Sequence, residues 1–210
     1  MRRSAAQTRL HILDAAYGLF WRQGFLRVSM DEIAARAGIT KRALYQHFKS
    51  KDALMAATLA YSSELALKRL RQFHRPVATG DELIEGYFAQ LREWARKPKY
   101  SGGGFTRAAV ELADLRGHPA RVIARRHKSA VESWLADELA ATGMPSASDR
   151  AREVMLLTEG AMALMLIHGD PGWSDAAAQA AKTLLRTRQT SERRSARARG
   201  RPRGAGRGRS

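Results

Sequence analysis

The chain has 210 residues, a formal net charge of +17 at pH 7 and a sequence pI near 11.2. It contains no cysteine, which excludes disulfide scaffolds, thiolate zinc sites and cysteine nucleophiles. No uninterrupted apolar run approaches the length of a membrane span, and the basic amino-terminal stretch has no convincing cleavage site, so we expect neither a membrane segment nor a secretory signal.

Basic charge is concentrated at the two ends of the chain. Residues 1–51 carry a net charge of +7, and so do residues 190–210, which leaves +3 for the residues between them. A polyanion such as nucleic acid is the natural partner of this distribution. For residues 190–210 taken alone, a solvated basic tail is the simpler interpretation.

The first 50 residues predict three short helices. The first has apolar residues at helical spacing and ends at Gly24; its stripe comprises Ile12, Ala15, Ala16, Leu19 and Phe20. Ser29 and Glu32 have the spacing of a capping box, so a second helix begins at Met30 and ends at Gly38. A third helix begins after Thr40, which can cap it, and runs to about Phe48.

The third helix is polar on its outer face. At about 100° per residue, Leu44 and Phe48 point inward while Arg42 and Gln46 point outward. Lys41 and Tyr45 lie on one flank, and Ala43 and His47 lie on the other. Such a face can place a guanidinium and an amide against base edges, with phosphate-binding groups beside them. A helical hairpin whose exposed face is merely basic is the alternative.

The rest of the chain also reads as helical. A long helix from Ser50 to about Phe73 suits a connector, and further helices are predicted in residues 81–97 and 105–115, Pro119–Thr142, Ser148–His168 and Trp173–Arg188. We find no alternating strand, so the predicted class is all-α. The expected organisation is a helix-turn-helix DNA-binding domain in residues 1–51, a larger helical domain in residues 52–189, and a disordered Arg-rich tail in residues 190–210.

The last two helices have the composition of a packing surface. The helix that ends at His168 is apolar nearly all round, and the final helix carries a series of alanines and leucines. Each can use one face for the protomer core and another for a second copy. We therefore expect a homodimer that pairs through these two helices.

Residues 8–54 resemble the DNA-binding domain of the TetR (tetracycline-repressor-like) family of bacterial transcriptional regulators. The residues that carry the resemblance are TRLHILDAAYGLFWRQGF and the block SMDEIAARAGITKRALYQHFKSKDAL. The segments GGGFTRAAVELA and LTEGAMALMLIHGDP also look like carboxyl-terminal segments of the family.

The resemblance implies a dimer whose two recognition helices enter successive major grooves of a palindromic operator in double-stranded DNA. The positions that usually meet the DNA backbone are Thr40, Tyr45, His47 and Lys51, and those that approach bases are Lys41, Arg42 and Ala43. Many members have a glycine where this chain has Arg42. Our hypothesis is that Arg42 reads a guanine through its O6 and N7 atoms.

The resemblance also implies a small-molecule pocket in the second domain and a repressor that an unknown effector releases from DNA by a population shift. The candidate lining residues are large apolar, aromatic or polarisable side chains, namely Tyr61, Phe88, Trp94, Phe105, Trp134, Met162 and His168. Most of them also suit an ordinary core, and His168 suits an interface. We predict no cofactor and no metal site.

Two alternatives concern function. The segment Arg199–Pro202 matches the four-residue core of an AT-hook, but four residues in an arginine-rich tract match readily by chance, and a nonspecific phosphate-binding tail is the default interpretation. With that tail, an architectural DNA-packaging protein is a rival to the regulator. An enzyme is not expected, because Walker, GxSxG and HExxH motifs are missing and carboxylates such as Glu111 and Glu159 are ordinary on helix surfaces. The expected location is the cytoplasm, in association with the nucleoid.

Overall fold

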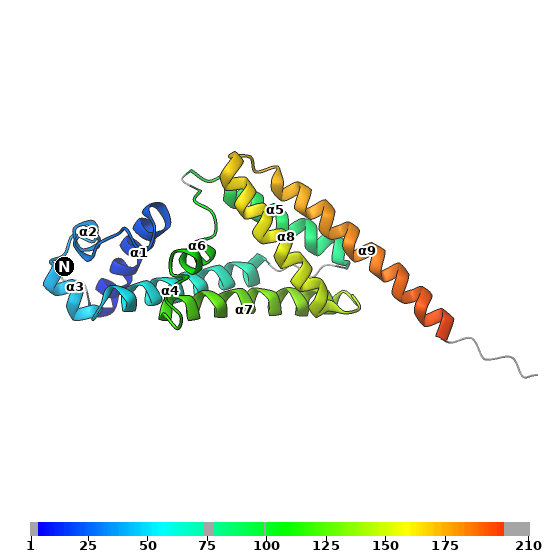
Figure 1. Cartoon of the computed structure of the whole chain (residues 1–210), viewed down its shortest axis with the longest axis horizontal. Coiled ribbons are helices and arrows are strands. Elements are labelled where there is room, and N and C mark those ends of the chain that lie inside the picture. The colour runs from blue at the N-terminus through cyan, green and yellow to red at the C-terminus, as the bar shows by residue number, and fades with distance from the viewer. Residues whose placement is uncertain (1–3, 74–77, 99, 200–210) are drawn as a thin grey trace, which may run out of the picture.

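The computed structural model describes residues 4–73, 78–98 and 100–199 (Figure 1). Within these residues the chain forms nine α-helices and no strand, which confirms the predicted all-α class. None of the helices in these ranges combines the length and the apolar character that crossing a bilayer requires.

Three helices form the amino-terminal end: α1 (Ala5–Gln23), α2 (Met30–Arg36) and α3 (Lys41–His47). Helix α1 begins before the predicted apolar stripe because Ser4 and Gln7 form a capping box. The Ser4 hydroxyl accepts a hydrogen bond from the Gln7 amide at 3.2 Å, and the Gln7 side chain accepts one from the Ser4 amide at 2.9 Å. The polar first turn of α1 is thereby helical although it contributes nothing to the core.

The amino-terminal helices share one hydrophobic core with distant parts of the chain. Phe20 of α1, Ile33 of α2 and Leu44 of α3 are completely buried in it. Residues around α6 (Gly104–Glu111) and at the start of α7 (Pro119–Ala141) complete this core, namely Phe105, Ala108, Leu112, Ala120 and Ala124. The predicted domain boundary near residue 51 therefore runs through continuous packing.

Helix α4 (Lys51–Phe73) leaves the amino-terminal helices and packs against α7 (Figure 1). A second core lies at the other end of these two long helices, where α7 meets α5 (Gly80–Ala95), α8 (Ala147–His168) and α9 (Trp173–Arg199). Ion pairs also join α5 to α9; they are Arg92–Asp175, Lys182–Glu85 and Arg186–Asp81.

Helix α9 continues past its predicted end at Arg188 to Arg199, so the predicted start of a disordered tail at Thr190 lies inside a helix. The reason is composition: Arg, Ala, Gln and Glu favour helix, and no glycine or proline interrupts the segment before Gly200. The end of α9 projects from the body at the opposite end of the molecule from α3 (Figure 1). Most of the proposed AT-hook core falls in residues 200–210, which lie outside the described residues.

Candidate functional site

Local hydrogen bonds form the turn between α2 and α3. The Ser29 hydroxyl accepts from the Glu32 amide at 3.2 Å. The Glu32 carboxylate accepts from the Ser29 amide at 2.7 Å and from the Ser29 hydroxyl at 2.8 Å, and these two bonds lower the pKa of Glu32. Gly38 follows α2 with a φ of +62°, which glycine adopts at little cost. Thr40 then caps α3 by accepting from the Ala43 amide at 3.1 Å. The predicted helix-turn-helix is therefore present.

Helix α3 divides into the faces that its spacing predicts. Leu44 and Phe48 are buried, with 0% and 3% of their surfaces exposed. Arg42 and Gln46 are exposed, and neither forms a hydrogen bond or ion pair with another described residue. Tyr45 is 40% exposed beside them. The outer face thus presents a guanidinium, an amide and a phenol to solvent.

Two lysines, one at the start of α3 and one at the start of α4, have partners within the protein. Lys41 pairs with Asp31 at 2.9 Å, and the hydrogen bond and charge of that carboxylate raise the lysine's pKa. Both side chains are more than half exposed, so the pair contributes little stability and can exchange for a phosphate. Lys51 donates to the Leu26 carbonyl at 2.7 Å, and partial desolvation lowers its pKa. This lysine therefore ties α4 to the loop between α1 and α2.

Arg9 of α1 joins this surface, although the sequence did not single it out. Its guanidinium lies 4.3 Å from the centre of the Phe48 ring and donates to the His47 carbonyl at 3.4 Å. The contact joins α1 to the carboxyl end of α3 and depends on how these helices pack. Arg9 adds a cation at the carboxyl end of α3.

Helix α6 is bonded to the end of α1 by two charged residues. The Glu111 carboxylate accepts from the backbone amides of Phe25 at 2.7 Å and Leu26 at 3.0 Å. Arg107 donates to Glu111 at 2.7 Å and to the Trp21 carbonyl at 2.9 Å. Partial burial raises the pKa of Glu111, but the hydrogen bonds from Leu26, Arg107 and Phe25 outweigh it and the net pKa is lowered. The sequence reading treated Glu111 as an ordinary surface carboxylate.

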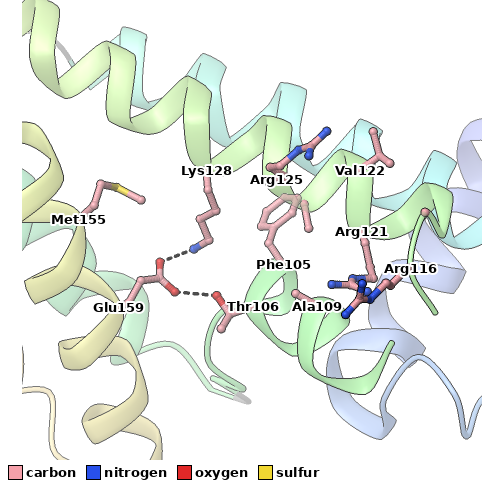
Figure 2. A pocket seen from close by; sticks show the side chains of 12 residues that line it. Phe105, Thr106, Ala109, Arg116, Arg121, Val122, Arg125, Lys128, Met155 and Glu159 are labelled. Carbon is pink, nitrogen blue, oxygen red and sulfur yellow. Dashed lines mark hydrogen bonds and ion pairs between the residues drawn. The ribbon is translucent and has the colours of Figure 1, made fainter. Parts of the chain in front are cut away.

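A cavity of about 810 Å³ opens between α6, α7 and α8 (Figure 2). Its apolar lining consists of Phe105, Ala109, Val122, Ala124 and Met155. Its charged lining consists of Arg116, Arg121, Arg125, Lys128 and Glu159. The spacing of Arg121, Arg125 and Lys128 places three cations on one face of α7, and this is the feature of the sequence that indicates the site.

Glu159 links three helices at one end of the cavity. Its carboxylate pairs with Lys128 of α7 and accepts from the Thr106 hydroxyl of α6 at 2.6 Å. Figure 2 shows the three side chains converging at the end away from Arg116 and Arg121. This carboxylate therefore has its own partners within the protein.

Of the seven predicted pocket residues, the cavity brings in Phe105 alone. Tyr61 packs against the first core. The second core contains or contacts Phe88, Trp94, Trp134 and Met162. His168 is exposed and stacks on Trp173 at 5.3 Å between ring centres. The effector role of these residues stays a prediction.

His127 lies where α4, α6 and α7 meet. Its ring stacks on Phe105 with 3.7 Å between centres, and its Nδ1 atom is 2.9 Å from the Ser63 hydroxyl oxygen. Burial, and then the charge of Lys128, lower the pKa of His127 to about 4. The imidazole is therefore neutral at pH 7 and packs as part of the cavity's support.

Helices α8 and α9 both expose small or apolar side chains at helical spacing. On α8 they are Leu156, Gly160, Ala163 and Ile167, of which Leu156 and Ile167 are each 71% exposed. On α9 they are Ala176, Ala180 and Leu184. Because α8 and α9 pack against each other, the two stripes belong to the helix pair that was predicted to carry the dimer interface.

Comparison with known proteins locates the strongest similarity at the amino-terminal end. A model described as bacterial regulatory proteins of the tetR family matches residues 12–58. The chain is 47% identical over 55 residues to the HTH-type transcriptional regulator AcrR of Shigella flexneri, which covers 26% of each chain. It is 34% identical over 93 residues to UidR of Escherichia coli K12, which covers 44% of this chain and 47% of UidR. The chain thus spans less than half the length of either curated relative.

Solved structures extend the likeness over most of the chain. A TetR-family transcriptional regulator from Streptomyces coelicolor, SCO4454, aligns with a TM-score of 0.78 and 24% identity, covering 87% of this chain and 96% of that one. A TetR-type regulator from Streptomyces avermitilis aligns with a TM-score of 0.68 and 27% identity, covering 83% and 98%. The carboxyl-terminal helices therefore share the fold of these proteins.

Proposed function

Because the chain belongs to the TetR family of bacterial transcriptional regulators, we propose that it binds a palindromic operator and is released from it by a small-molecule effector. The family and the fold are those of DNA-binding regulators and not of enzymes. The observation that carries the proposal is the exposed face of α3, which stands on a buried base formed by Leu44 and Phe48. A cytoplasmic location at the nucleoid follows from the proposed DNA binding.

In the proposed complex α3 enters the major groove. Arg42, which has no partner among the described residues, donates two hydrogen bonds to a guanine, and Gln46 lies on the same face toward the neighbouring bases. Lys41 and Ala43 approach the same base pairs. The phosphate contacts come from Thr40, Tyr45, His47 and Lys51, to which the position of Arg9 adds a further cation.

A second copy of the chain supplies the second recognition helix. The exposed stripes of α8 and α9 are the proposed contact surface, because Leu156 and Ile167 lose contact with water only when another chain covers them. Two copies related by a twofold axis present two α3 helices to half-sites about 34 Å apart, one turn of the DNA duplex.

Helix α6 is the proposed route from effector to DNA. Phe105, Thr106 and Ala109 of α6 line the cavity, while Arg107 and Glu111 of the same helix hold the end of α1. A ligand that shifts α6 therefore acts on the backbone at residues 25 and 26, and Lys51 connects that loop to α4. The effector favours the conformer in which the two α3 helices no longer match the half-sites.

Footprinting on genomic DNA tests whether the chain binds discrete operators. The substitution Arg42→Ala tests whether Arg42 reads a base within them. We expect protection of discrete palindromes, with operator affinity reduced by about 1–3 kcal/mol in the variant while affinity for random DNA changes little. Arg36→Ala removes an equal charge from the exposed surface of α2 and serves as the control; it should weaken both affinities alike.

One result contradicts the proposed function, and another contradicts only the role of Arg42. Uniform coating of DNA favours the architectural alternative that the Arg-rich carboxyl-terminal segment suggests. An Arg42→Ala protein that loses operator and random-DNA affinity equally rules out base reading by Arg42.

A further inference from the structure

We propose that the cavity between α6, α7 and α8 binds an amphipathic organic anion, with a carboxylate or similar acid group on an apolar body. The acid group lies at Arg116 and Arg121, with Arg125 one helical turn further along α7, and the apolar body lies against Phe105 and Met155. The regulatory consequence of this binding rests on the proposed function, but the binding itself does not.

The side chains that line the cavity carry an excess of positive charge, which favours an anionic ligand. Four cationic side chains and a single carboxylate face the cavity. The carboxylate, Glu159, is already bound to Lys128 and to Thr106, so it neutralises none of the three arginines. Arg116 and Arg125 form no ion pair with any described residue. An anion at this place relieves the repulsion among like charges and gains charge-assisted hydrogen bonds.

One of the arginines is held in position before any ligand arrives. Arg121 donates to the Ala113 carbonyl, just beyond α6, at 2.8 Å. The remaining N–H groups of its guanidinium form a planar fork that matches the two oxygens of a carboxylate. Figure 2 shows the guanidinium groups of Arg116 and Arg121 at the same end of the cavity.

The apolar wall narrows the class of anion. Phe105 is 8% exposed and its ring is stacked on His127, so it is a firm surface and not a mobile side chain. Val122 and Met155 are half-buried around the same space, and methionine adapts its shape to a ligand. A small hydrated ion such as phosphate would not cover these apolar side chains, which would stay exposed to water. A volume of about 810 Å³ instead matches the range of cavities that hold drug-sized ligands.

The two ends of the cavity set the orientation of the ligand. Glu159 stands at one end and repels a second carboxylate, while Arg116 and Arg121 stand at the other (Figure 2). The acid group therefore faces the arginine end, and the apolar body extends past Phe105 toward Met155. This body also contacts α6, the helix that Arg107 and Glu111 bond to α1.

Calorimetric titration of the full chain tests the site, with decanoate and 2-naphthoate compared with their primary amides. We expect at least one acid to bind about tenfold or more tightly than its amide, because the amide keeps the shape and loses the charge. In the double variant Arg116→Gln with Arg125→Gln, acid affinity should fall about tenfold or more. Amide affinity should stay unchanged.

Arg126→Gln is the matched control. Arg126 is exposed on α7 but does not line the cavity, so its substitution removes a positive charge close to the cavity and should leave acid binding unchanged. Unchanged thermal unfolding of all variants shows that the fold is intact.

Equal affinities for acid and amide, no binding of either acid, or full acid binding by the double variant overturns the anion site. Footprinting without any ligand keeps this result separate from the proposed function. A chain that protects an operator but binds neither acid contradicts the anion site alone. A chain that binds the acid and protects no operator contradicts the proposed function alone.

Discussion

Helices α3 and α6 are both short and both carry side chains proposed to act in function, but different forces hold them in place. Helix α3 is capped by Thr40, three residues from the amide it bonds, and a capping box begins the helix before it. Helix α6 has no side-chain hydrogen bond at its amino-terminal cap and depends on Trp21, Phe25 and His127 from other elements. The position of α3, the helix proposed to read DNA, thus depends on residues close in sequence, whereas the position of α6 beside the cavity depends on residues of other elements.

The arginine of α3 and those that line the cavity differ in their surroundings. Arg42 is exposed on the outer face of α3 and does not line the cavity, which suits a polyanion reached from solvent. Arg121 and Arg125 border a hollow that contains Phe105 and Met155, which suits an anion with an apolar body. Both regions use arginine, so the two proposed ligands, DNA and an organic anion, follow from what surrounds each guanidinium and not from the residue type.

The largest effect is expected from Gly104→Ala, at the start of α6. A Cβ atom there would lie 1.9 Å from the Cε2 atom of Trp21, a side chain only 7% exposed. The two helices must therefore separate, and we expect a loss of about 3 kcal/mol in the free energy of unfolding. Chemical denaturation followed by circular dichroism measures it.

Gly86→Ala is the control for that experiment. Gly86 lies in α5 with nothing within 4 Å of an added Cβ atom, so the change should stabilise the protein by about 0.5–1 kcal/mol. If Gly104→Ala also leaves stability intact, tertiary packing does not position α6 and the contrast with α3 fails.

Low pH should lower the free energy of unfolding through His127, whose ring packs against Phe105 of α6. Unfolded histidine binds a proton near pH 6.5, but the buried ring of His127 does so only near pH 4, so the unfolded state holds more protons between these values. Stability should therefore fall by about 2 kcal/mol as the pH drops from 6.5 to 4.5.

His127→Gln removes this group, so its unfolding free energy should fall less over the same pH window. Denaturation curves at several pH values supply the comparison. An equally steep slope in the variant would assign the acid sensitivity to other groups.

The smallest effect is expected from removing the side-chain caps of α2 and α3. Ser29→Ala and Thr40→Ala each remove one capping hydrogen bond and should cost about 1 kcal/mol. For a chain of this size that corresponds to a fall in Tm of about 2–4 °C. A loss as large as that of Gly104→Ala would mean that the caps do not act locally and that α3, too, depends on packing with distant parts of the chain.

Residue order alone predicted the features that depend on neighbours a few positions away. Ser29 with Glu32, Gly38 and Thr40 predicted how α2 and α3 begin and end, and helical spacing placed Leu44 inward. Such features follow because capping and periodicity act within one or two turns. The end of α9 was predicted too early, since Arg-rich composition was read as disorder although its residues favour helix.

Tertiary structure decided the cavity and its connection to α1. Glu111 reaches backbone amides 86 and 85 positions away, and Glu159 meets Thr106 and Lys128 from two other helices. No local sequence pattern distinguishes these two carboxylates from solvent-exposed ones. Most of the large aromatic residues that were expected to line the pocket lie instead in the two hydrophobic cores or against them. The physical reason is that a cavity exists where faces of separate helices fail to fill the space between them, which depends on the packing of the whole fold.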